Sequence, residues 1–78
     1  MATCKISLNS IDQVKEFVGF ANASKFDIDL ISGRYVVDAK SIMGIFSLDL
    51  TKQLELSVHA SADEAADFMD DIKPYIVG

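Results

Sequence analysis

The side chains that could carry covalent or metal chemistry are few in this sequence and lie far apart. His59 is the single histidine and Cys4 the single cysteine. One His and one Cys at opposite ends of the chain make no metal-binding cluster. No Ser-His-Asp arrangement can be argued, and no glycine-rich phosphate loop occurs. We therefore expect no metal, no cofactor and no enzymatic activity.

One segment, Lys40–Leu50, does combine a hydroxyl group with large apolar side chains. Ser41 is a good N-cap because its hydroxyl can accept a hydrogen bond from an unpaired backbone N–H at a helix start. A helix this short cannot bury all of its apolar side chains under a small domain, so we expect an exposed apolar patch beside Ser41. Its members are Ile42, Met43 and Phe46. Such a patch predicts a protein partner, and it could also join two copies of the chain in a homodimer.

Length and composition limit what the partner can be. The 78 residues are expected to form one domain over 1–78, and half of them are apolar, which is enough for a core. The lone cysteine fits a reducing compartment, so we expect a cytoplasmic protein. The net charge of −5 argues against binding to nucleic acid, and no apolar run approaches the length of a membrane span. We therefore expect protein partners, with no nucleic acid and no membrane.

The elements that must position these residues follow from the spacing of apolar residues. Four segments are predicted to be strands, three because apolar and polar residues alternate along them and one because it returns after a turn. They are residues 3–8, 25–30, 35–37 and 53–58. The second and third strands should be joined by a turn at Ser32-Gly33, because glycine takes a positive φ without steric cost.

Two longer segments show helical spacing. The first helix should run from about Ile11 to Asn22 behind a capping box formed by Ser10 and Gln13. The apolar residues on its core face are Ile11, Val14, Phe17, Val18 and Ala21. The last helix should open with a second capping box and end near Lys73, before Pro74. That box pairs Ser61 with Glu64, and the core face carries Ala65, Phe68, Met69 and Ile72.

The order strand, helix, strand, strand, short helix, strand, helix predicts an α+β fold. Because every strand is amphipathic, the four-stranded sheet should be antiparallel with all three helices on one face, as in an open-faced β-sandwich. The predicted core residues are Ile6, Leu8, Val14, Phe17, Val18, Phe26, Ile28, Leu30, Val36, Leu54, Leu56, Val58, Phe68 and Ile72.

The same order and two short motifs resemble HPr, the phosphocarrier of the bacterial sugar phosphotransferase system. That family typically reads Lys-Ser-(Ile/Leu)-Met-Gly-(apolar)-Met-Ser-Leu where this chain has Lys40–Leu48, with Phe46 in place of methionine. A second local match is Ala23–Asp27, which is similar to the family's Ala-Ser-(Lys/Arg)-(Phe/Tyr). The resemblance runs from about Thr3 to Ile76, and it implies the HPr fold.

The resemblance breaks at the family's chemistry. HPr proteins open their first helix with Gly-(Ile/Leu)-His-(Ala/Thr)-Arg-Pro, where the histidine carries the phosphoryl group and the arginine stabilises it. The corresponding positions here are residues 10–15, and they contain no histidine, arginine or proline. Asp12 occupies the histidine's place, which makes it a degenerate active-site position. We therefore expect no phosphocarrier reaction through this site.

Two functional hypotheses follow from the resemblance. The first is a non-catalytic regulatory or adaptor protein, similar to the catabolite-repression HPr-like proteins, which docks partners through Ser41–Phe46. The implied partners are a phosphotransferase-system component, a serine kinase or a transcriptional regulator. Ser41 is then the candidate for regulatory phosphorylation, and the alternative is an ordinary capping serine.

The second hypothesis is a phosphocarrier that uses Asp12 or His59 as an unorthodox acceptor. Each residue also has an ordinary explanation. An acidic residue is favoured in the first turn of a helix, and a histidine near a strand end is commonly a surface residue. A third possibility is a protein that keeps the fold but has an unrelated function.

Overall fold

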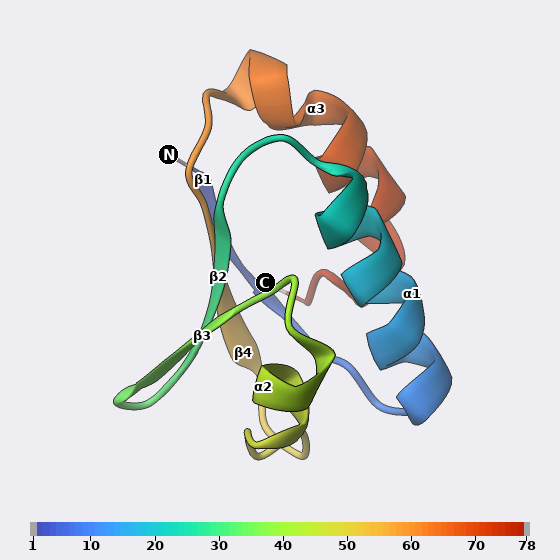
Figure 1. Cartoon of the computed structure of the whole chain (residues 1–78), viewed down its shortest axis with the longest axis vertical. Coiled ribbons are helices and arrows are strands. Elements are labelled where there is room, and N and C mark those ends of the chain that lie inside the picture. Colours follow the sequence, from blue (N-terminus) through green and yellow to red (C-terminus); the bar gives the residue numbers. More distant parts are fainter. Residues whose placement is uncertain (1, 78) are drawn as a thin grey trace.

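The computed structural model describes residues 2–77 and arranges them as one four-stranded sheet with the helices on one side (Figure 1). The elements in chain order are β1 (Ala2–Ile6), α1 (Ile11–Ala23), β2 (Ile28–Ser32), β3 (Tyr35–Asp38), α2 (Ile42–Phe46), β4 (Leu54–Val58), α3 (Ala62–Asp71) and a 3-10 turn, η1 (Lys73–Tyr75). Helices α1 and α3 contact each other, and α2 contacts both α1 and β3. The predicted α+β fold is confirmed.

The strand order in the sheet is β1-β4-β2-β3, and every neighbouring pair is antiparallel. The chain just after η1 runs along the outer edge of β1. There the backbone N–H of Ser7 donates to the carbonyl of Tyr75 over 2.8 Å, and that of Val77 donates to the carbonyl of Lys5 over 2.9 Å. The sheet therefore has β3 at one edge and a β1 edge that residues 75–77 cover in part.

Serine side chains start all three α-helices. The Oγ atoms of Ser10, Ser41 and Ser61 each accept a hydrogen bond from a backbone N–H three residues on. The capping box of Ser61 and Glu64 is confirmed in both directions. The box predicted for Ser10 is wrong in one half, because the Gln13 side chain accepts from the backbone N–H of Asn9 instead.

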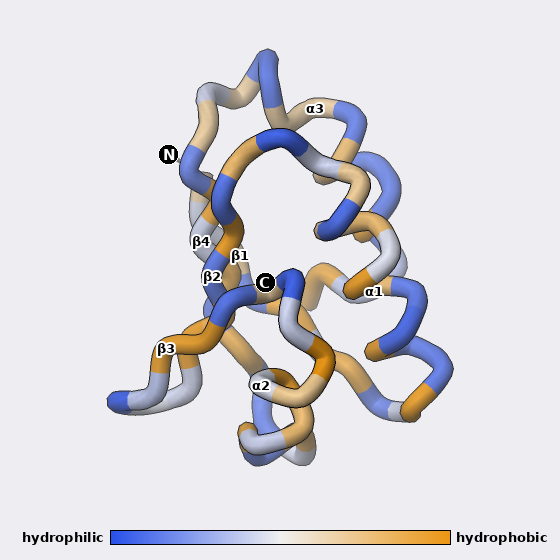
Figure 2. Tube along the Cα trace, in the orientation of Figure 1, coloured by the Kyte–Doolittle hydropathy of each residue, from blue (hydrophilic) through white to orange (hydrophobic). Residues whose placement is uncertain are grey.

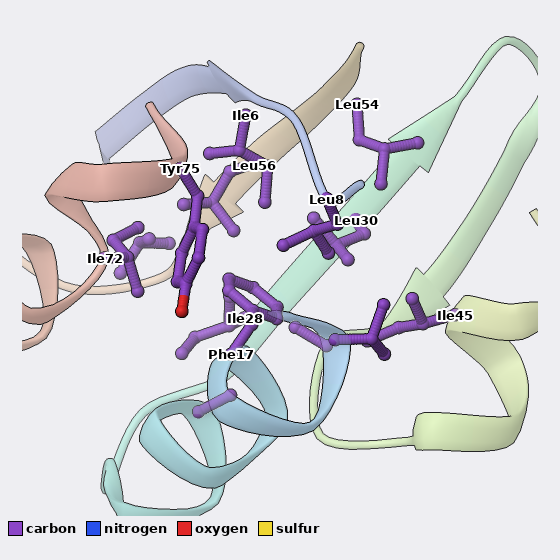
Figure 3. Packing of buried hydrophobic residues seen from close by; sticks show 14 of the residues in the cluster. Ile6, Leu8, Phe17, Ile28, Leu30, Ile45, Leu54, Leu56, Ile72 and Tyr75 are labelled. Atoms are coloured by element: carbon purple, nitrogen blue, oxygen red, sulfur yellow. The ribbon is translucent and has the colours of Figure 1, made fainter. Parts of the chain in front are cut away.

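The core lies between the inner face of the sheet and the helices (Figure 3). Side chains from β1, β2 and β4 meet Phe17 of α1, Ile45 of α2 and Ile72 beyond α3. Burying a side chain of this size stabilises the fold by about 1.5–3 kcal/mol. In contrast to the core, the tip of the β2–β3 hairpin is hydrophilic, and it points away from the rest of the fold (Figure 2).

The burial predicted for Val36 is wrong, since its relative exposure is 60%. The strand register places Val36 opposite Ile31 and Val37 opposite Leu30. Leu30 is buried, so Val37 is the residue of β3 that faces the helices, and Val36 lies on the outer face. A shift of one residue along a strand exchanges its two faces.

Smaller differences concern burial and a turn. Val18 and Phe26 are only partly buried against the core, while Ile45 and Tyr75 are core residues that the prediction did not include. The β2–β3 turn also begins one residue later than predicted, because Ser32 still pairs with Tyr35. Gly33 does take the expected positive φ, 61°.

Candidate partner-binding surface

Helix α2 is short, and one side chain anchors it. Ile45 is fully buried and points into the core (Figure 3). At the helix start, Ser41 Oγ accepts from the backbone N–H of Gly44 over 3.2 Å, and the Ser41 carbonyl accepts from Ile45 N–H over 3.1 Å. At the helix end, Ser47 Oγ donates to the Gly44 carbonyl. The Ser41 hydroxyl thus caps the helix while the residue remains exposed.

Gly44 lets α2 approach both its own cap and the neighbouring strand. A Cβ atom at this position would lie 3.3 Å from Ser41 Oγ and 3.3 Å from the Cβ of Val37. These contacts are tighter than ordinary van der Waals separations, so a larger residue would push α2 away from β3. The glycine therefore allows the close packing of α2 on β3.

The exposed side of α2 carries Met43 and Phe46, whose relative exposures are 78% and 40%. Ile42 is instead partly buried and packs against the core, so its inclusion in one fully exposed patch is wrong. The reason is that the first turn of α2 lies over the core, which leaves only two of the three predicted residues outward.

A second apolar side chain, Ile11, lies near Phe46. Both line a surface groove of about 640 Å³ between the start of α1 and the end of α2, together with Leu50. We call it the Phe46 groove. Ile11 is 62% exposed, so its expected place on the core face of α1 is wrong. Helical periodicity places it on the apolar stripe, but it is the first residue of the helix, at the edge of the core, and most of its surface stays open.

The degenerate active-site position does not line the groove itself, although the three residues before it do. Asp12 is exposed in the first turn of α1, directly after Ile11. The N–H groups around this helix start are partly used by the chain itself, since Ser10 Oγ accepts from Gln13 N–H and Gln13 Oε1 accepts from Asn9 N–H. A phosphate would have to compete with these side chains for backbone donors.

The single arginine does not serve this helix start. Arg34 lines a different recess, between the β2–β3 hairpin tip and residues 47–53, where Lys52 also lies. No arginine therefore lines the Phe46 groove among the described residues, and the basic side chain that stabilises phosphate in the family has no counterpart there.

His59 lies elsewhere. Its Nε2 atom is 2.7 Å from Asp29 Oδ2, and its backbone N–H donates to the Asp27 carbonyl. Strand alternation puts His59 and Asp29 on the sheet face away from the helices, because Val58 and Ile28 are the buried neighbours. The structure therefore does not bring Asp12 and His59 together into one site.

The remaining candidates for chemistry are structurally ordinary. Cys4 is partly buried on the inner side of β1, and burial raises the pKa of its thiol. Within residues 2–77, no group of three or more His, Cys, Asp or Glu side chains is placed to hold a metal ion. In the same part of the chain, no helix has the length and apolar character needed to cross a membrane.

Comparisons with known proteins agree with the fold. A family model described as the PTS HPr component phosphorylation site matches residues 12–77. No curated protein sequence matches the chain.

Several solved structures resemble the chain, among them two HPr proteins and Crh. HPr-C-His from Thermoanaerobacter tengcongensis superposes with a TM-score of 0.74 at 24% identity, covering 94% of this chain and 92% of that one. The phosphocarrier protein HPr from Bacillus anthracis gives 0.72 at 22% identity, covering 97% and 96%. Crh, the catabolite repression protein of Bacillus subtilis, gives 0.63 at 23% identity, covering 95% and 88%, and is described as a domain-swapped dimer.

Proposed function

The chain belongs to the HPr family of the phosphotransferase system, and on this premise we propose that it is a regulatory or adaptor member without phosphocarrier or enzymatic activity. The observation that carries the proposal is the division of α2 into an anchored side and a free side. Ile45 holds the helix on the core while Met43 and Phe46 remain available to a partner. As a family member it is expected to work in the cytoplasm.

The start of α1 is poorly suited to phosphoryl transfer. A carboxylate at position 12 repels an incoming phosphate, and no arginine lines the adjoining groove among the described residues to neutralise the transferring group. His59 is paired with Asp29 on the other side of the sheet and is not part of that helix start. These two facts weigh against the alternative in which Asp12 or His59 serves as acceptor.

The free side of α2 suits a transient protein contact. Burying the exposed part of Met43, 78% of its surface, in a partner would contribute about 1.2–2.3 kcal/mol, and the exposed 40% of Phe46 about 0.6–1.2 kcal/mol, before the entropic cost of association. A phosphate on Ser41 would add nearly two negative charges at the edge of this surface. It would then attract a partner that offers arginine and repel an acidic one.

The expected partners are a phosphotransferase-system component, a serine kinase that modifies Ser41, or a transcriptional regulator. Self-association is a further possibility, because the similar structure of Crh is described as a swapped dimer. A dimer formed through the free side of α2 would use the same residues.

Phosphorylation by phosphoenolpyruvate and the first enzyme of the system tests the loss of phosphocarrier activity. HPr from Bacillus anthracis is the positive control in the same reaction. We expect mass spectrometry to find the phosphoryl group on the control and none on Asp12 or His59. Transfer onward to a sugar permease that is lost in Asp12→Asn would overturn the proposal.

A capture experiment tests the docking surface. Proteins retained by the wild-type chain should be lost when both Met43 and Phe46 are replaced by serine. Val36→Ser is the matched control, because Val36 is also an exposed apolar residue but lies on the outer sheet face. Equal retention by the double variant would remove the basis for docking through α2.

A further inference from the structure

A second groove lies at the other end of α1, where that helix meets α3. It has a volume of about 480 Å³, and three phenylalanines, Phe20, Phe26 and Phe68, form part of its lining. It shares no lining residue with the Phe46 groove. The proposed function therefore leaves this groove without a role.

The aromatic part of the groove is held in place by ring packing. The Phe68 ring contacts Phe26 edge-on at a centroid distance of 6.0 Å and contacts Phe17 edge-on at 6.2 Å. Phe20 and Phe26 are only partly buried, so apolar ring surface remains open to the groove. A partner's apolar side chain would meet a preformed surface.

Acidic side chains of α3 line the groove beside these rings. Glu64, Asp67 and Asp71 are spaced three and four residues apart, which puts them along one side of the helix. The salt bridges among residues 2–77 join His59 to Asp29 and Lys73 to Asp70, so none neutralises these three carboxylates. Lys25 is the one basic residue that lines the groove, which leaves it with a net negative charge.

We propose that this groove binds a cationic amphipathic segment of a partner protein. Apolar side chains of the segment would pack on the three phenylalanines, and its lysines or arginines would face Glu64, Asp67 and Asp71. The charge argues against other occupants. A symmetric contact between two copies would set two acidic grooves against each other, and nucleic acid or an anionic membrane would be repelled.

An NMR titration of the full chain with a synthetic amphipathic helix of Leu and Lys tests this proposal. The matched peptide control carries Glu in place of Lys. We expect amide shifts to cluster at Phe20, Phe26 and Phe68 with the basic peptide, and no saturable shifts with the acidic one. The affinity should fall as salt is raised, because exposed charges are screened.

Paired variants separate the groove from general negative charge. Asp67→Asn combined with Asp71→Asn should weaken binding roughly threefold to tenfold at low salt. Asp63→Asn combined with Asp70→Asn removes the same charge from α3 outside the groove and should leave the affinity within about twofold. Far-UV circular dichroism checks that each variant is folded.

Several outcomes would overturn the proposal. Equal weakening by the two variant pairs would reduce the effect to net charge, and shifts centred on Phe46 would move the site to the other groove. Sedimentation showing a dimer that Asp67→Lys disrupts would identify a second copy as the occupant. Absence of saturable shifts, or binding to anionic vesicles with the same footprint, would equally contradict it.

Discussion

Replacing Ile45 by alanine is expected to remove a large part of the stability of the fold, whereas Met43→Ala should leave it nearly unchanged. Ile45 is fully buried, and such a truncation typically costs 2–5 kcal/mol, about 3 kcal/mol in the middle of that range. Proteins of this length have about 4–12 kcal/mol of total stability. Met43 keeps 78% of its surface exposed, so only about a fifth of a full burial term, roughly 0.3–0.7 kcal/mol, is at stake.

Urea unfolding followed by far-UV circular dichroism measures both changes, since the chain has no tryptophan for a fluorescence signal. The midpoint for Ile45→Ala should fall with little change in slope, and Ile45→Val should lose about 0.5–1.5 kcal/mol. A loss below about 1 kcal/mol for Ile45→Ala would mean that the core does not anchor α2. If Met43→Ala lost as much stability as is expected for Ile45→Ala, the Met43 side chain would not be free to contact a partner.

Three further perturbations have expected outcomes. Burial, and to a smaller extent the hydrogen bond to Glu16, raises the pKa of Tyr75 to about 12. In a Tyr35→Phe variant, which leaves Tyr75 as the single tyrosine, the tyrosinate absorbance should therefore titrate near that pH. Because this pKa exceeds the value near 10 of an unfolded tyrosine, the free energy of unfolding should decline from about pH 10 to 12, and Tyr75→Phe should reduce that decline. Ser61→Ala removes the capping box and should cost about 1 kcal/mol in urea unfolding, while Ser61→Asp should cost less. Gly33→Ala should cost about 1 kcal/mol because of the positive φ, and an unchanged urea midpoint would contradict that strain.

Much of the fold could be predicted because its signals are local. The alternation of Leu54, Leu56 and Val58 marks a strand by itself, and Ser61 followed by Glu64 marks a helix start. Val36 was assigned to the wrong face because a short apolar run does not reveal which residue pairs with a buried one. That information lies in the register with β2 and not in the strand's own residues.

Tyr75 shows the same limit over a longer distance. It follows Pro74 as an isolated aromatic residue, and nothing around it in sequence indicates burial. Its side chain is buried in the core, and its hydroxyl donates a hydrogen bond to Glu16 of α1, which lies 59 residues earlier. Core residues outside regular elements are visible only after the elements have been assembled.

The candidate site was partly predictable because one of its signals, the length of α2, is local. The length of α2 alone predicts that some apolar side chains stay outside, and Met43 and Phe46 do. The burial predicted for Ile11 is wrong because helical spacing describes which side of α1 a residue faces, but not how much of the first turn the rest of the fold covers. The second groove, where α1 meets α3, is lined by residues from different segments, so no single sequence motif predicts it.

The pairing of β1 affects when the sheet can form during translation. In the sheet β1 bonds to β4, and on its other side it bonds to residues 75–77. Its backbone partners are therefore translated well after β1 itself. β1 therefore lacks its strand partners until β4 and residues 75–77 have been synthesised, and such non-local pairing slows the closing of the sheet. Thr3 and Lys5, which alternate with the apolar residues of β1, keep one face of that waiting strand hydrophilic.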